Sequence, residues 1–213
     1  MPQLCVVAIS DRRLMIPPDL LAGPWAAVAR AFGAAVERAV AGCAPGSVIV
    51  QIREKDLDGG PLLALVRAAQ PFAPVMVNDR VDVALAADAH GVHLPERGLS
   101  IADARAVAPS LVLGVSRHAA AADTAGADLV QLGSIWPTPS KPGATPLGEA
   151  ALAARHGRAT LVAVGGIDSP ERAEAAAAAG ADAVAVIRAA WRGASLAPLV
   201  AAVEAGRARR FAS

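Results

Sequence analysis

Eight short runs of apolar, mostly β-branched residues recur along the chain. They are residues 5–10, 47–53, 74–79, 91–94, 111–116, 129–134, 160–166 and 183–188. Each run is apolar almost throughout, which is typical of strands buried on both faces of a parallel sheet. Seven intervening segments and a C-terminal one, including the Ala-rich stretch at 173–180, have the residue spacing of helices. The pattern therefore predicts alternating strands and helices around a parallel sheet.

Internal similarity sets the size of the repeating unit. AGADLVQLGSI at 125–135 resembles AGADAVAVIRA at 179–189, and the two copies begin 54 residues apart, which is two units of about 27 residues. In each copy we expect the Gly to end a helix in the left-handed conformation. Eight such units fill the 213 residues and predict an α/β fold, a single compact (β/α)8 TIM barrel over residues 1–213. An open doubly wound sheet is the alternative, but no G-x-G-x-x-G follows the first run.

The composition argues against several classes of function. Lys and Arg number 20 against 19 Asp and Glu, and the basic residues gather only at Arg207, Arg209 and Arg210. We therefore expect neither nucleic acid nor a membrane surface as partner. No apolar run approaches the roughly 18 residues of a spanning helix, and the N-terminus lacks a secretion signal, so we expect a cytoplasmic protein. Cys5 and Cys43 lie in apolar segments without metal-ligand spacing and predict buried free thiols. Whether the chain forms a homo-oligomer stays open.

Polar residues at the C-terminal ends of the predicted strands are the candidates for function, because the active sites of such barrels lie there. The second run ends in Gln51, Arg53, Glu54 and Lys55. Alternation places Gln51, Arg53 and Lys55 on one side and Glu54 on the other. Two cations at the mouth of a barrel predict an anionic ligand, whereas the alternative is a surface cluster of Arg, Glu and Lys.

Further polar residues end the next three runs. Asn78 and Asp79 follow the third run, and Asp79 either caps the next helix or binds a hard cation such as Mg²⁺. His93 lies in the fourth run, and Ser116 and His118 end the fifth. Each histidine is either hydrogen-bonded scaffolding or a catalyst.

The connection at 135–148 is long and holds four prolines, whereas most such loops have about two to six residues. Proline stiffening would hold Thr138, Ser140 and Lys141 in place for a ligand. We therefore expect this loop to be functional.

The last two runs end in turns that are suited to phosphate. They carry Gly165 and Gly166 after the seventh run and Ile187 and Arg188 after the eighth. Backbone N–H groups after strands seven and eight form the usual phosphate site of these barrels. A second cationic cluster, made by Arg53, Lys55 and Lys141, predicts a second anion site. Two anion sites indicate two phosphorylated groups.

Six segments, in their order along the chain, resemble the thiamine phosphate synthase family, including its thiazole tautomerase branch. They are QIREK at 51–55, VNDRVDVALAADAHGVHL at 77–94, GVSRH at 114–118, GADLVQLGSIWPTPSKPG at 126–143, VAVGGI at 162–167 and GADAVAVI at 180–187. The resemblance covers nearly the whole chain. It implies that the protein couples hydroxymethylpyrimidine diphosphate to thiazole phosphate in thiamine biosynthesis, as a transferase that releases diphosphate. It also implies Mg²⁺ as cofactor and these two small phosphorylated molecules as partners.

The resemblance further implies a role for each candidate residue. The diphosphate would be held by Arg53, Lys55, Asn78 and Lys141, and Mg²⁺ would be ligated by Asp79. The pyrimidine would be oriented by Gln51 and Ser116. The thiazole phosphate would be bound by Thr138, Ser140, Gly166 and the turn at Ile187 and Arg188, beside Gly165. Catalysis then requires stabilisation of charge on the leaving diphosphate, which Arg53 and Lys141 supply. For proton transfer in the tautomerase branch, the matching residue is His118.

The chain departs from the family at three positions. Synthases usually carry a second Mg²⁺-binding Asp after GVHL, in a GQ-x-D context, whereas this chain reads LPERGLS and places Gly98 there. Glu96 is the substitute carboxylate if the loop takes a different path. Arg188 stands where a Ser is usual and either strengthens phosphate binding or blocks it, and Arg117 lies next to His118.

These departures leave alternatives open. A tautomerase needs only His118 and no metal, and a non-catalytic barrel would bind thiazole phosphate without turnover. We favour the synthase because a tautomerase has no diphosphate to neutralise, which would leave Arg53, Lys55 and Lys141 unexplained. Which form of the thiazole, carboxylated or not, is the substrate stays open.

Overall fold

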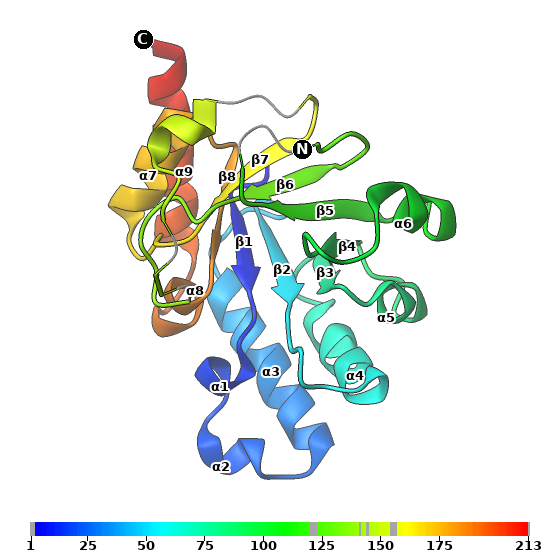
Figure 1. Cartoon of the computed structure of the whole chain (residues 1–213). Helices are drawn as coiled ribbons and strands as arrows, with labels where there is room; N and C mark the ends of the chain where they lie inside the picture. Colours follow the sequence, from blue (N-terminus) through cyan, green and yellow to red (C-terminus); the bar gives the residue numbers. More distant parts are fainter. Residues whose placement is uncertain (1–2, 120–122, 141, 144, 154–156, 213) are drawn as a thin grey trace.

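The computed structural model describes residues 3–119, 123–140, 142–143, 145–153 and 157–212, and its strands form a closed parallel barrel (Figure 1). The strands follow one another around the barrel in chain order: β1 (Val6–Ile9), β2 (Val48–Ile52), β3 (Val75–Asn78), β4 (Gly91–Leu94), β5 (Val112–Arg117), β6 (Leu129–Leu132), β7 (Thr160–Val164) and β8 (Ala183–Val186). Each predicted run holds one of them, except that β5 extends one residue beyond its run, to Arg117. The prediction of a (β/α)8 barrel is confirmed.

Helices surround the barrel on the outside. They are α1 (Arg12–Met15), α2 (Pro18–Leu21), α3 (Trp25–Val40), α4 (Gly59–Ala69), α5 (Val81–Ala86), α6 (Ile101–Val107), the 3-10 helix η1 (Glu149–Ala153), α7 (Pro170–Ala179), α8 (Arg188–Arg192) and α9 (Ala197–Ala212). As predicted, the Ala-rich stretch lies in a helix, α7. It packs closely on α9, where a Cβ on Gly206 would come within 2.2 Å of the Glu174 carbonyl oxygen.

The expectation of a helix after every strand is wrong at two connections. In the described residues between β5 and β6 the chain forms only turns and bends, and between β6 and β7 its one helix is the 3-10 helix η1. The backbone N–H of Ala125 donates to Asp123 Oδ1 at 3.0 Å, and such local side-chain bonds compete with helix formation. Gly126, with φ +85°, closes this turn, whereas Gly180 ends α7 with φ +133° as expected. In the other connection the prolines remove helix donors.

The strands are mostly apolar because both of their faces are buried. Val7, Ile9, Ile49, Met76, Leu129, Val162, Ala183 and Ala185 point inward and fill the barrel. The alternate residues pack outward against the helices in two further clusters.

The arginines near the C-terminus help to close the barrel at the opposite end. Arg207 is buried and donates to the carbonyls of Leu4 and Asp182, and Arg210 pairs with Asp182 at 3.3 Å. These contacts account for Arg207 and Arg210 as structural residues. None of the described helices is long and apolar enough to cross a membrane.

Both cysteines are free thiols, as predicted. Cys5 is buried, but Cys43 is only half-buried, which corrects the expectation for that residue. Burial raises the pKa of both thiols.

Candidate active site

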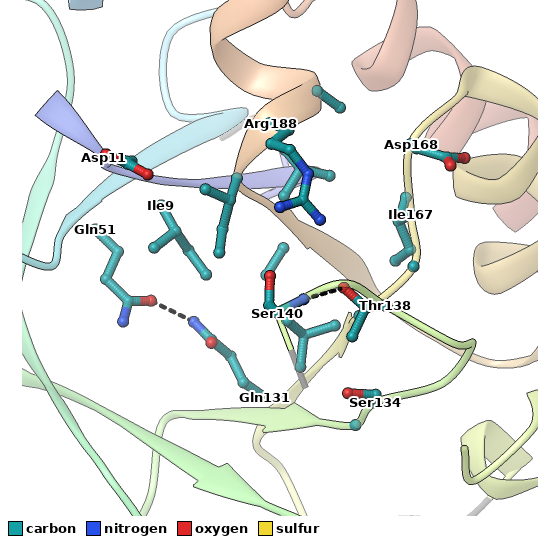
Figure 2. A pocket seen from close by; sticks show the side chains of 18 of the residues that line it. Ile9, Asp11, Gln51, Gln131, Ser134, Thr138, Ser140, Ile167, Asp168 and Arg188 are labelled. Carbon is teal, nitrogen blue, oxygen red and sulfur yellow. Dashed lines mark hydrogen bonds between the residues drawn. The ribbon is translucent and has the colours of Figure 1, made fainter. Parts of the chain in front are cut away.

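A cavity of about 1000 Å³ opens at the C-terminal ends of the strands (Figure 2). The structure brings most of the predicted residues together around it: Gln51, Arg53, Lys55, Asn78, Glu96, Ser116, His118, Thr138, Ser140, Gly165, Gly166, Ile187 and Arg188. Asp79 is not among the lining residues. Lys141 lies outside the described residues. Most of the polar residues that follow the apolar runs in the sequence therefore line this cavity, as predicted.

The cavity has a polar and an apolar side. Strands β2 to β6 each contribute one polar side chain to its wall, namely Gln51, Asn78, His93, Ser116 and Gln131. Ile9, Val164 and Ala185 from β1, β7 and β8 line it with apolar groups. Such a wall suits a flat heterocycle with hydrogen-bonding atoms on its edge.

The amides on the polar side are hydrogen-bonded to one another. Gln131 Nε2 donates to Gln51 Oε1 at 2.6 Å (Figure 2), and Gln51 Nε2 donates to Asn78 Oδ1 at 3.2 Å. Sequence reasoning missed Gln131. Its signal was a lone polar residue within the run LVQLG at 129–133, at a position that faces inward by alternation.

His93 is a buried scaffold residue and is neutral near pH 7. Burial, and then the charges of Arg53 and Arg117, lower the pKa of its imidazole to about 3. Its Nε2 lies 2.8 Å from Ser116 Oγ, whereas its Nδ1 has no partner in the described part of the chain. Because an orphaned N–H is rarer than an orphaned acceptor, we place the proton on Nε2. The Ser116 hydroxyl then keeps its own proton for a ligand.

A buried carboxylate fixes the backbone at the end of β2 through Ser10. Glu54 turns away from the cavity, as alternation predicted, and accepts from Ser10 Oγ at 2.6 Å and from Arg12 Nη1 at 2.8 Å. Ser10 Oγ in turn accepts the backbone N–H of Arg53 at 2.9 Å. Arg53 and Lys55 form no ion pair with another described residue, so their charge is available to a ligand and the surface-cluster alternative is not supported.

Asp79 occupies a special backbone position after β3. Its φ is +66°, and its backbone N–H donates to the carbonyl of His93 at 2.8 Å. Asp is one of the few residue types that adopt this conformation readily. The next helix, α5, has Arg80 at its N-cap and no side-chain cap, so the capping alternative for Asp79 is excluded. Its carboxylate is exposed, and the described residues include no group of three or more His, Cys, Asp or Glu that could hold a metal ion.

His118 and Glu96 face each other at the cavity. His118 Nδ1 lies 2.6 Å from the carbonyl oxygen of Gly133, which can only accept, so Nδ1 carries a proton. His118 Nε2 lies 3.7 Å from Glu96 Oε2, and both side chains are about half exposed. Glu96, the expected substitute for the missing second metal-binding Asp, thus lies beside His118, the candidate acid/base group.

The turn after β7 requires glycine at both positions. Gly165 and Gly166 have φ of +96° and +75°. A Cβ on Gly165 would lie 2.6 Å from Ser134 Cβ, and one on Gly166 would lie 2.6 Å from Trp136 Cβ. This close approach presses the turn against the loop after β6.

Arg172 joins these two loops. It donates to the carbonyl of Gly166, and its guanidinium lies 5.8 Å from the centroid of the Trp136 ring. Trp136 is therefore engaged in packing beside the cavity. On the loop after β6, the backbone N–H of Ser140 donates to Thr138 Oγ1 at 3.4 Å (Figure 2).

Arg188 extends into the cavity from the start of α8 (Figure 2). It is half-buried and forms no ion pair with a described residue. Its positive charge is therefore directed into the cavity.

A family profile described as thiamine monophosphate synthase, TMP-TENI, matches residues 21–190. The chain belongs to the thiamine monophosphate synthase family. A putative thiamine-phosphate synthase of Geobacter sulfurreducens is 45% identical over 169 residues, which cover 73% of this chain and 78% of the relative. The thiamine-phosphate synthase of Xanthobacter autotrophicus is 38% identical over 181 residues, or 79% and 84% of the two chains.

A solved member of the thiamine monophosphate synthase family has the same fold. The thiamine phosphate pyrophosphorylase of Pyrococcus furiosus matches with a TM-score of 0.63 and 29% identity, over 98% of this chain and 96% of that one. The resemblance read from the sequence is confirmed.

Proposed function

We propose that this protein is a thiamine phosphate synthase, which couples hydroxymethylpyrimidine diphosphate to thiazole phosphate and releases diphosphate. The observation that carries the proposal is the pair of cations Arg53 and Lys55, which face the cavity and pair with no acidic residue in the part of the chain that the structure describes. The names of the relatives support the same activity. A cytoplasmic location belongs to this proposal as well.

In the reaction, the C–O bond between the pyrimidine methylene and the diphosphate breaks, and its electron pair leaves with the diphosphate. The lone pair of the thiazole nitrogen then forms the new C–N bond to the methylene. Arg53, Lys55 and Lys141 hold the diphosphate, with Asn78, and stabilise the charge that develops on it. No base is needed, because the attacking nitrogen carries no proton.

The pyrimidine binds against the polar side of the cavity. Gln51 and Ser116 orient its edge, and the neutral His93 keeps the Ser116 hydroxyl in place. The apolar groups of Ile9 and Val164 cover the rings. Fixing both reactants in one orientation supplies much of the rate acceleration.

The thiazole phosphate binds at the glycine turn. Gly165 and Gly166 allow its phosphate to approach the backbone closely. The other groups proposed to hold it are Thr138, Ser140, Ile187 and Arg188. Arg188 supplies a full positive charge, which strengthens this site more than a neutral hydroxyl would.

Mg²⁺ is proposed as the cofactor, with Asp79 as its protein ligand. Mg²⁺ is commonly held by one or two carboxylates together with substrate phosphates, so the exposed carboxylate of Asp79 fits without a preformed cage. When bound, the ion would neutralise charge on the diphosphate. Glu96 remains a prediction as second carboxylate, although its contact with His118 favours another role.

That contact also supports a second candidate function, the tautomerisation of thiazole phosphate carboxylate. The Gly133 carbonyl fixes the proton on Nδ1 of His118, so Nε2 is the atom that would accept or donate a proton. Glu96 Oε2 lies 3.7 Å from this nitrogen.

The test is an assay of purified protein with hydroxymethylpyrimidine diphosphate and either form of thiazole phosphate, with and without Mg²⁺. Thiamine phosphate is followed by the fluorescence of its oxidised form. Mg²⁺-dependent product supports the synthase, and its absence with both thiazole forms contradicts it. Isomerisation of the thiazole tautomer alone would then support the tautomerase, and affinity without any product would support a non-catalytic binding protein.

A further inference from the structure

We propose that Gln131 determines specificity for the pyrimidine. It fixes the orientation of the Gln51 amide and adds a hydrogen-bonding group of its own to the cavity. The inference rests on the proposed function, because it assigns the pyrimidine ring of that substrate to the part of the cavity wall formed by Gln51 and Gln131.

Gln131 is placed to do this by the barrel itself. It lies on β6, is 4% exposed and reaches Gln51 on β2, which is 80 residues earlier in the chain and 1% exposed. The 2.6 Å bond between them has a short donor–acceptor distance for an amide pair. In a buried site, an amide oxygen that loses its donor is costly to leave unpaired. Gln131 therefore holds Gln51 in one of the two orientations that a terminal amide can adopt.

The side-chain amides of Gln131, Gln51 and Asn78 form a row in which each hydrogen bond is donated in the same direction. It runs from Gln131 N–H to Gln51 oxygen, and from Gln51 N–H to Asn78 oxygen. This leaves the Gln131 oxygen at one end and the Asn78 nitrogen at the other, and neither bonds another described residue. Both residues line the cavity, so the row presents one acceptor and one donor to a ligand. Reversal of all the amides would exchange the two ends but would still present one of each.

This arrangement selects a ligand by its hydrogen-bonding edge. An aminopyrimidine carries both an exocyclic amino group that donates and ring nitrogens that accept, so its edge complements the Gln131 end of the row, while the Asn78 end is left to the diphosphate. A thiazole ring has no comparable edge. Sites that hydrogen-bond a substrate group discriminate strongly against molecules lacking it, because buried polar groups are then left unpaired.

The experiment measures binding of each substrate separately by titration calorimetry. The proteins are the wild type, Gln131→Leu and Leu129→Met, the last as a control that changes an inward apolar side chain of the same strand. We expect Gln131→Leu to weaken binding of hydroxymethylpyrimidine diphosphate about ten- to fifty-fold, as for one unpaired buried group. Binding of thiazole phosphate should change less than about twofold, and Leu129→Met should affect neither ligand.

A second variant separates hydrogen bonding from simple packing. In Gln131→Glu the protonated carboxyl can donate to Gln51 Oε1, whereas the carboxylate cannot. Burial raises the pKa of such a carboxyl. The ratio of variant to wild-type dissociation constants for the pyrimidine should therefore rise with pH. A Gln131 that serves only to pack the barrel predicts a ratio independent of pH, and this variant remains informative if Gln131→Leu fails to fold.

The outcomes are distinct. Unchanged pyrimidine binding in Gln131→Leu, or equal weakening of both ligands, overturns the inference, as does a wild type that binds thiazole phosphate but not the pyrimidine. Because binding requires no turnover, a wild type that binds the pyrimidine without forming thiamine phosphate refutes the proposed function while Gln131 is still tested.

Discussion

The carboxylate of Asp79 lies against Gly98, so that a Cβ built on Gly98 would come within 2.9 Å of Asp79 Oδ1. The same Cβ would lie 2.9 Å from Cδ of Pro95. A larger side chain at position 98 therefore has no room unless Asp79 or the loop moves. The family resemblance places a second metal-binding Asp at this position, and in this chain the carboxylate of Asp79 borders the space instead. The proposed Mg²⁺ site accordingly rests on Asp79.

Replacement of Asp79 by Asn should abolish Mg²⁺-dependent synthesis of thiamine phosphate, because the amide keeps the shape but loses the charge that binds the ion. The matched control is Asp82→Asn, which removes a neighbouring carboxylate that pairs with Arg80. Activity measured against Mg²⁺ concentration should be lost only in Asp79→Asn. Near-normal activity in that variant would show that the metal is held elsewhere.

Substitution of Gly98 by Ala tests the close contact directly. The added Cβ should displace the Asp79 carboxylate and raise the Mg²⁺ concentration needed for half-maximal activity about three- to tenfold, a change of roughly 1 kcal/mol. The KM for thiazole phosphate should stay the same, because that site lies on the other side of the barrel mouth. An unchanged Mg²⁺ dependence would mean that Asp79 does not bind the ion.

His118 and Glu96 should matter for proton transfer and not for coupling. His118→Gln removes the acid/base group, and Glu96→Gln removes the carboxylate that lies 3.7 Å from its Nε2. We expect both variants to retain most synthase activity, and any isomerisation of thiazole phosphate carboxylate to fall at least about a hundredfold in His118→Gln. Loss of coupling with retained isomerisation would reverse the order of the two candidate functions. The readout is product formation in parallel assays with the two substrates.

Glu54 should stabilise the fold and position Arg53. Glu54→Gln weakens the buried contacts to Ser10 and Arg12 and should lower the free energy of unfolding by about 1–3 kcal/mol. Asp56→Asn is the control: Arg12 holds the pKa of Asp56 well below its usual range, but that carboxylate is half exposed. Its loss should cost less than about 1 kcal/mol. Urea unfolding measures both, and equal losses would contradict the role of Glu54.

His93 should make stability depend on pH. Its pKa is lowered from 6.5 to about 3 in the folded protein. Between these two pH values the unfolded chain therefore binds one proton more at this histidine than the folded protein does. The free energy of unfolding should therefore fall as pH falls through this window, by up to about 1.4 kcal/mol per pH unit. Burial lowers the pKa of His90 as well and adds a slope of the same sign. Unfolding measured against pH should show a smaller slope in His93→Asn than in the wild type, and an equal slope would contradict a neutral, buried His93.

Much of this molecule follows from local features of its sequence. The apolar runs predicted the strands, because strands buried on both faces consist mostly of apolar residues. The order of units gave the barrel, and its geometry brings Gln51, Asn78 and Ser116 to one rim without any knowledge of their contacts. Alternation separated Arg53 from Glu54, since successive side chains of a strand point to opposite faces. The family resemblance followed from the same segments.

Contacts between distant segments needed the tertiary structure. No local pattern indicates that Gln131 bonds Gln51 across the barrel, or that Asp79 lies against Gly98. The direction of Glu96 toward His118 depends on the path of a loop, which neighbouring residues do not determine. Sequence periodicity specifies which face a side chain occupies, but the partner on that face is decided by how strands far apart in the chain close into one barrel.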